Sequence, residues 1–437
     1  MRYFSLASIQ SLTTKQKIGY VLLVAFILFY VIIECLGHGD FTLFLKASEL
    51  IRLGDNPYGK WIQIQGENYS RYFYSPLWSI LLWPFTYLPF VVGRLFWLCM
   101  NVWFTFRIWI LLKKYVDLKS LTQNQANWVI ILSTALSIRF ILYNFDLIQM
   151  TLFLLWGILE SVQRFRSSQW ILGGVILALI INVKIMPIVI LPYLAFRGKF
   201  KALSITIAAF ILMLFLPALF LGWETNLFLL GEWWSVIDPT MAEHKFESVI
   251  GPHSLTALIP ALLMETQGRL GIARNILNLT PELVTMIVRS AQSILVIFTL
   301  YFLKWPAFRV SKDRLGVLYE LAYISLVIPL IFPHQQKYAF ALAIPAQFYL
   351  AYYLISQSHN RKTRWKLVAT FLALSFVLMT LTTDGVIGRE LNLISRHFKL
   401  VTYGMFFLIA ALAFARPKHL RNRSLEPNDT YSHEPQQ

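Results

Sequence analysis

Charged residues are scarce in this 437-residue chain. Asp, Glu, Lys and Arg together make up 14% of the sequence, whereas hydrophobic residues make up 57%. A soluble globular domain has roughly a quarter of its residues charged. The shortage of charge therefore argues against a soluble protein and predicts one that crosses the membrane many times.

Cysteine is almost absent, and several familiar catalytic motifs are missing. The two cysteines, Cys35 and Cys99, both lie in apolar segments, so we expect neither a disulfide framework nor a cysteine-based metal site. The sequence contains no Walker phosphate loop, no Gly-x-Gly-x-x-Gly, no His-Glu-x-x-His and no Asp-x-Asp motif. These absences argue against ATP-driven and nucleotide-sugar chemistry, and we expect no cofactor and no metal.

Basic residues are in excess, with 39 Lys and Arg against 22 Asp and Glu and a net charge of +17. They form short clusters between apolar runs rather than a continuous face, so a nucleic-acid partner is not expected. Twelve apolar runs are candidate transmembrane helices: residues 18–36, 90–112, 126–143, 147–162, 170–183, 185–196, 202–222, 284–303, 316–332, 338–356, 367–383 and 399–415. With a cytoplasmic N-terminus, the inner segments carry 23 of the basic residues and the outer segments 12, as the positive-inside rule requires.

Two stretches fit this pattern less simply. Residues 170–196 are either one long span or two short helices broken near Lys184 and Pro187, and the charge rule favours the break. Residues 76–88 are too short to cross, contain Pro76 and Pro84 and are followed by Pro89, so we place them as a tilted segment before the span at 90. We predict an all-α integral membrane domain over residues 1–415, with an uncleaved first span, and a disordered cytoplasmic tail over 416–437.

Two outer segments, 37–75 and 223–283, are too long to be simple connections, and long ordered loops are usually functional. In the first, residues 41–53 place Lys46, Glu49 and Arg52 on one face, which predicts a helix lying on the outer membrane surface. Asp40, directly before this helix, has two interpretations. It is the N-cap of the helix or a general base toward a hydroxyl group, and the two roles are compatible.

Other polar residues map to the same side of the membrane. They are Tyr58 in the turn Asp-Asn-Pro-Tyr-Gly, Arg71 and Tyr74 before the tilted segment, Asp146 and Gln149 in a short outer turn, Lys184 at the helix break, and His334 and Lys337 in a polar outer turn. A turn, an aromatic belt or a hairpin explains most of them individually. Lys184 is the exception, because a lysine between two apolar half-helices is costly and indicates a functional site.

These residues, in this order, resemble glycosyltransferase family 87. The resemblance rests on the Asp after the first span, a surface helix ending in Gly-Asp-Asn-Pro-Tyr, the aromatic run 73–77, the polar turn at 144–149 and the Lys before Pro187. The sequence departs from the family in Tyr74-Ser75-Pro76, where the family has Tyr-Pro-Pro, and in Ile148-Gln149, where it has Gly-Gln.

The resemblance implies a bundle of the GT-C type in a bacterial inner membrane. The expected reaction transfers a sugar, mannose in the family, from a polyprenyl-phosphate donor to a glycolipid or glycan acceptor on the periplasmic side, with inversion at the anomeric carbon. It implies Asp40 as catalytic base and His334 as a second catalytic residue. Lys184, Arg71 and Lys337, with Arg139 as a weaker candidate, are expected to bind the donor phosphate, and Tyr58, Tyr74, Asp146 and Gln149 to bind substrate.

Two other classes of protein share many spans and a large outer loop: a flippase of lipid-linked sugars, and an O-antigen ligase or polymerase. The sequence shows no internal repeat of the kind that many transporters have. An assay of glycoside formation separates these classes, because a flippase only relocates its lipid.

The predicted orientation is testable with single cysteines in a background lacking Cys35 and Cys99. We expect Glu67→Cys and Glu243→Cys to react with a membrane-impermeant maleimide on intact spheroplasts, because both positions lie in predicted outer segments. Labelling that requires permeabilised membranes would reverse the orientation.

Overall fold

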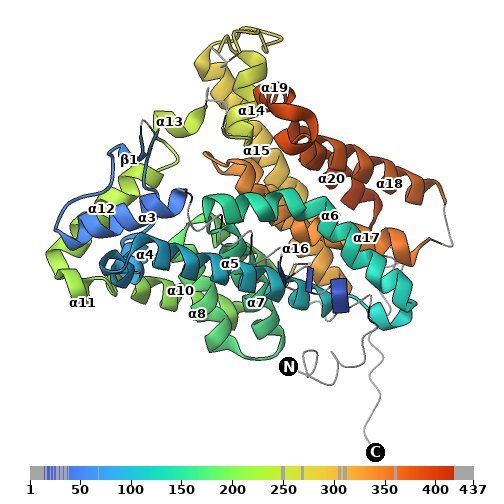
Figure 1. Ribbon diagram of the computed structural model, residues 1–437, viewed down its shortest axis with the longest axis horizontal. Coiled ribbons are helices and arrows are strands. Elements are labelled where there is room, and N and C mark those ends of the chain that lie inside the picture. The colour runs from blue at the N-terminus through green and yellow to red at the C-terminus, as the bar shows by residue number, and fades with distance from the viewer. Residues whose placement is uncertain are drawn as a thin grey trace, which may run out of the picture.

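The computed structural model describes residues 39–66, 68–247, 251–266, 270–303, 307–308, 313–358 and 362–417, with scattered positions between 14 and 37. Helices make up nearly all of this structure (Figure 1), beside one two-stranded sheet. The predicted first span at 18–36 is described only at scattered positions. His38 and the tail beyond residue 417 lie outside the described residues.

A helix is present at each predicted span from residue 90 onward. They are α5 (Phe90–Lys113), α6 (Gln123–Leu147), α7 (Thr151–Arg166), α8 (Trp170–Val183), η3 (Met186–Val189), α9 (Ile190–Phe196), α10 (Phe200–Phe215), α11 (Ala218–Leu221), α15 (Pro281–Leu303), α16 (Arg314–Ile331), η4 (Lys337–Ala343), α17 (Ile344–Ser356), α18 (Thr363–Phe376), η5 (Val377–Leu381) and α20 (Leu400–Phe414). In the described part of the chain, seven helices are long and apolar enough to cross a membrane, or eight with a bent pair. Helices α7 and α8 are shorter than the roughly 20 residues that a full crossing needs.

The outer segments fold into short elements. The first contains α3 (Asp40–Arg52), β1 (Ile62–Gln65), β2 (Asn68–Ser70), α4 (Pro76–Leu82) and η1 (Trp83–Tyr87), and the second contains α12 (Trp223–Ile237), α13 (Ala242–Lys245) and α14 (Leu255–Leu263); η2 (Leu118–Ser120) lies in another connection. The amphipathic helix α3 confirms the predicted pattern, with Phe41, Phe44 and Ala47 buried and Glu49 exposed. The hairpin β1–β2 was not predicted.

A further helix, α19 (Asp384–His397), occupies a segment predicted as a connection. It meets α20 at an angle of 74°, and Figure 1 shows it at the top of the molecule near α14. The helix is amphipathic. Asn392 and Ser395 lie on its buried face, and Leu391 is exposed. Such a polar helix lacks the long apolar run by which the spans were recognised.

The helix is interrupted between α8 and η3, as the charge pattern predicted. Helix α8 ends at Val183, Lys184 is extended (φ −149°, ψ 124°), and η3 begins at Met186 with Pro187 in its first turn. Proline lacks an N–H group and is tolerated at a helix start but not inside one. Lys184 therefore lies directly after the C-terminal end of α8, not within a continuous helix.

The centre and the periphery of the bundle differ in burial. In the apolar stretches of α16 and of η4–α17, 83% and 78% of the residues are buried, whereas the fraction is 11% in both α10–α11 and α15. The first two helices form the core, and the other two present their apolar surfaces outward. In a membrane these outward surfaces contact lipid.

A buried ion pair joins the core to the short helix α9. Arg197, at the end of α9, pairs with Glu320 of α16, and the two side chains are 7% and 1% exposed. The Tyr193 hydroxyl donates a further hydrogen bond to Glu320 (3.0 Å). Removing one partner leaves the other charge buried and uncompensated, which is strongly destabilising.

We expect Glu320→Ala to lower the free energy of unfolding by about 3–5 kcal/mol and to lower the thermal midpoint in detergent. The double substitution Arg197→Met with Glu320→Leu should recover most of this loss, because it removes both buried charges. A midpoint for Glu320→Ala equal to that of the parent would contradict the importance of the pair.

Candidate active site

Asp40 lies at the first residue of α3, and its carboxylate does not cap that helix. Gly39 is the N-cap residue, and no side chain makes a capping hydrogen bond there. The N-cap interpretation of Asp40 is therefore wrong. The carboxylate instead accepts a hydrogen bond from the Gln149 side-chain amide, because the start of α3 packs against the turn that follows α6. A Cβ atom at Gly39 would lie 2.7 Å from the Leu147 carbonyl oxygen, so this close approach requires glycine.

Gln149 is presented by an unusual turn. Helix α6 continues to Leu147, and Ile148 then adopts a left-handed conformation (φ 50°) that reverses the chain. Gln149 is fully buried. Asp146, predicted in an outer turn, instead belongs to the last turn of α6 and is exposed; Arg94 donates to its backbone carbonyl (3.2 Å).

Lys184 is a cation that interacts electrostatically with Asp40. Its ammonium group lies 5.3 Å from the ring centre of Tyr74 and 5.4 Å from that of Tyr338, which is the range of cation–π attraction. Burial raises the pKa of Asp40 to about 6, while the charge of Lys184 and the hydrogen bond from Gln149 act in the opposite direction. Asp40 is thus a carboxylate that titrates close to neutral pH, as a general base requires.

The aromatic residues of the outer segment support this pair. The Tyr58 hydroxyl donates to the Tyr74 carbonyl (2.9 Å), and both side chains are buried. Tyr58 therefore holds Tyr74 in place through the backbone. Arg71, expected near the donor phosphate, has its guanidinium 5.2 Å from the ring centre of Trp61 beside the hairpin.

His334 belongs to a chain of hydrogen bonds that the sequence did not indicate. Its Nδ1 lies 2.7 Å from a Glu247 carboxylate oxygen, and its Nε2 lies 2.8 Å from His244 Nδ1. His244 Nε2 lies 3.0 Å from the Val236 carbonyl, which can only accept. His244 Nε2 therefore donates to that carbonyl, and one proton is shared between the facing nitrogens of His244 and His334. Burial alone would raise the pKa of Glu247, but the hydrogen bond and charge of His334 hold it below its usual value.

The His334 chain adjoins the Asp40 pair. The His334 ring stacks on Phe73 with centres 5.2 Å apart and an angle of 16°, and Phe73 directly precedes Tyr74. On the other side, Asn144 of α6 donates to the Tyr338 carbonyl (2.9 Å) and holds the start of η4. Two short segments, 73–74 and 334–338, therefore connect the two groups of polar residues.

Lys337 lies in a cluster of cations that the sequence revealed only in part. Its ammonium group is 3.5 Å from the Asn392 side-chain oxygen, and electrostatic interactions couple it to Arg139 and Arg396. Arg139 donates to Thr382 through the side-chain oxygen (2.7 Å) and the carbonyl (3.0 Å). None of these three cations forms an ion pair with an acidic residue that the structure describes.

A buried histidine lies beside the same cations. His253 has no exposed surface and makes no hydrogen bond through either ring nitrogen. Burial, and then the charges of Lys399 and Lys337, lower the pKa of His253 well below its usual range, so the ring is neutral.

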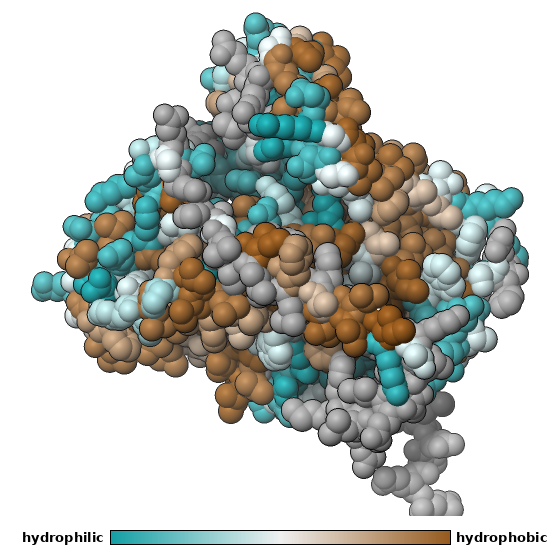
Figure 2. Space-filling view, viewed as in Figure 1, coloured by the Kyte–Doolittle hydropathy of each residue, from teal (hydrophilic) through white to brown (hydrophobic). Residues whose placement is uncertain are grey.

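In Figure 2 hydrophilic residues line a recess below the lobe that carries α14, while the flank that carries α18 and α20 is largely hydrophobic. The excess of positive charge suits an anionic ligand.

The described residues contain no group of three or more His, Cys, Asp and Glu side chains that could hold a metal ion. Of the predicted residues, the structure brings Asp40, Gln149, Lys184 and Tyr74 together. The signal that would have indicated Arg396 and Asn392 is the amphipathic pattern of 384–397.

Comparison with known proteins identifies the family. The family model described as glycosyltransferase family 87 matches residues 72–380, a region that includes Tyr74, Gln149, Lys184 and His334 but begins after Asp40. No curated protein and no solved structure matches the chain. The match covers well over half of the sequence, and the resemblance seen in the motifs is confirmed at the level of the family. The chain belongs to glycosyltransferase family 87.

Proposed function

We propose that this membrane glycosyltransferase has the GT-C architecture and transfers mannose from a polyprenyl-phosphate donor to a glycolipid or glycan acceptor. The observation that carries the proposal is the Asp40–Lys184 pair, which brings a carboxylate that titrates near neutral pH next to a cation at the ends of membrane helices. The proposed location is the bacterial inner membrane, with segments 37–75 and 223–283 and the active site on the periplasmic side.

In this reaction Asp40 acts as the general base. Its carboxylate takes the proton of the acceptor hydroxyl as the hydroxyl oxygen bonds to the anomeric carbon of the sugar. The bond from that carbon to the phosphate oxygen breaks on the opposite face, and its electron pair leaves with the phosphate. The product is a glycoside of inverted configuration and a free polyprenyl phosphate. A phosphate leaving group needs positive charge rather than a proton.

The cations divide this task. Lys184 lies beside Asp40, so we propose that it keeps the carboxylate ionised and also faces the donor phosphate. Lys337, with Arg139 and Arg396, forms no ion pair with a described acidic side chain, and we propose that it binds the departing phosphate. Arg71, at the hairpin, is proposed to contact the donor headgroup from the outer side.

The remaining predicted residues position these groups. Gln149 orients the Asp40 carboxylate, and Tyr74 provides an aromatic face beside Lys184. Tyr58 supports Tyr74, and Asp146 is proposed to contact the acceptor from the end of α6. Both ring nitrogens of His334 are engaged with Glu247 and His244, so we propose that His334 positions the surrounding segments rather than acting as a proton shuttle.

We expect Asp40→Asn to reduce glycoside formation by roughly 10²- to 10⁴-fold, because an amide cannot take the hydroxyl proton. The purified protein in nanodiscs is given polyprenyl-phosphate mannose and a lipid extract containing acceptors, and new glycosides are measured by mass spectrometry. Glu49→Gln, on the exposed face of the same helix, is the control and should retain activity. Transfer by Asp40→Asn at the parent rate would remove Asp40 from the mechanism, and lipid relocation without glycoside formation would indicate a flippase.

The charge of Lys184 should appear in the pH profile. Because Asp40 must be ionised, we expect kcat/KM of the parent enzyme to fall about tenfold per pH unit below about pH 6. The positive charge of Lys184 lowers the pKa of Asp40. In Lys184→Met this charge is absent, so the fall in kcat/KM on the acidic side of the pH profile should begin at a higher pH. If Lys184→Met raises the KM for the donor but leaves the acidic side of the pH profile unchanged, Lys184 contacts only the phosphate.

A further inference from the structure

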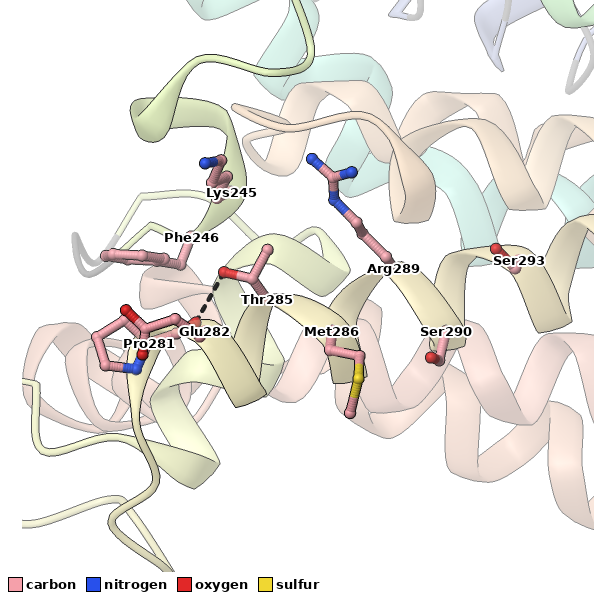
Figure 3. A pocket seen from close by; sticks show the side chains of 9 residues that line it. All are labelled: Lys245, Phe246, Pro281, Glu282, Thr285, Met286, Arg289, Ser290 and Ser293. Atoms are coloured by element: carbon pink, nitrogen blue, oxygen red, sulfur yellow. Dashed lines mark hydrogen bonds between the residues drawn. The ribbon is translucent and has the colours of Figure 1, made fainter.

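Two adjoining cavities of about 880 and 680 Å³ lie between α13 and α15. They share Lys245 of α13 and Thr285, Arg289 and Ser293 of α15, and together form one groove, here called the α13–α15 groove. Figure 3 shows Lys245 and Arg289 on the same side of the pocket, above the axis of α15. The groove is separate from Asp40 and Lys184, which do not line it.

The outer end of the groove is positively charged. Lys245 and Arg289 make no ion pair with an acidic residue in the described ranges. The 680 Å³ cavity has no acidic residue in its wall, and Glu282, which is exposed, lies at the edge of the other cavity. Thr240, Thr256 and Gln292 add polar side chains at this end. An anionic group is the complementary ligand for such a wall.

The other end of the groove is apolar. Along α15 the wall continues from Arg289 to Val296 and Ile297, and across the groove it is formed by Ile331 and Phe332 of α16 and the following loop. These residues follow one face of α15 at helical spacing. Helix α15 is an apolar helix of spanning length with 11% of its span buried, so this end of the groove lies at membrane depth. Cations at Lys245 and at Arg289, in the first half of α15, and an apolar wall farther along the helix match a lipid that carries a phosphate.

The groove also leads to the active site. His244 forms part of its wall and hydrogen-bonds His334, and the wall residues Phe332 and Pro333 are followed by His334 and Lys337. A lipid in the groove would therefore have its headgroup beside the segment that carries the proposed phosphate ligands.

We propose that the α13–α15 groove is the entrance at which the polyprenyl-phosphate donor is captured from the bilayer. The isoprenoid chain lies along Val296 and Ile297, and the phosphate is first bound by Arg289 and Lys245. From there the phosphate passes His244 to reach Lys337 and Lys184. The identity of the lipid rests on the proposed function, whereas the existence of a lipid-phosphate site does not.

Binding is tested first, with no sugar present. The full-length protein in phosphatidylcholine nanodiscs is irradiated with a photoreactive undecaprenyl phosphate, and the modified peptides are identified. We expect labelling of α15 that unlabelled undecaprenyl phosphate competes away and phosphatidylglycerol does not. Arg289→Gln combined with Lys245→Gln should reduce the labelling roughly tenfold, while Lys60→Gln, an exposed lysine of the outer hairpin segment, should not. Equal competition by phosphatidylglycerol would show ordinary boundary lipid and overturn the proposal.

Kinetics then separate capture from chemistry. Val296→Trp fills the groove, whereas Ile294→Trp places the same side chain two residues away on another face of α15, and both positions are exposed. We expect Val296→Trp to raise the KM for an undecaprenyl donor about tenfold with kcat unchanged, and to leave the KM for a ten-carbon donor near that of the parent. Ile294→Trp should match the parent for both donors. Equal KM values for the two tryptophan variants would exclude the groove from the donor path.

The two proposals fail in different ways. Labelling of the groove without transfer from any polyprenyl-phosphate sugar would contradict the proposed function and leave the lipid site standing. Transfer with an unlabelled groove and unaffected variants would contradict the entrance alone.

Discussion

The Asp40 carboxylate and the Lys184 ammonium group form the charged pair on which the arrangement of the outer side depends. Removing two charges from water is costly, and their attraction compensates only when both are held in place and hydrogen-bonded. In this structure Asp40 accepts a hydrogen bond and Lys184 lies beside two aromatic rings, and four separate segments contribute these groups. The start of α3 supplies Asp40, the turn after α6 supplies Gln149, the break after α8 supplies Lys184, and η4 supplies Tyr338.

The unusual backbone features of the protein lie where these segments meet. Gly39 allows α3 to approach the Leu147 carbonyl, the left-handed Ile148 turns the chain so that Gln149 points inward, and Pro187 starts a new helix just after Lys184. Each feature is individually unfavourable or uncommon in a membrane helix. Their convergence on one pair of side chains is a physical argument for function that does not depend on any motif.

Around this pair the protein has more positive than negative charge. Lys337 and Arg139 contact neutral oxygen atoms, and neither these two cations nor Arg396 forms an ion pair with a described acidic side chain; neutral His253 lies beside Lys337 and Arg139. Buried cations without counter-ions are normally avoided. In the proposed reaction the missing negative charge arrives with the substrate, and it becomes larger at the phosphate as the sugar leaves, when electrostatic stabilisation matters most.

The sequence by itself determined the helices and the candidate base. A bilayer requires long apolar helices, so the spans could be read from hydropathy, and Lys184 and Pro187 marked the break because both are costly within a membrane helix. Only the tertiary structure decided how these residues are used. It showed that Asp40 bonds Gln149 rather than capping its own helix, and that His334 pairs with His244 and Glu247, which are 90 and 87 residues away. Such partners leave no local signal, because their proximity arises from the packing of distant segments. Helix α19 was missed because its amphipathic sequence contains no long apolar run.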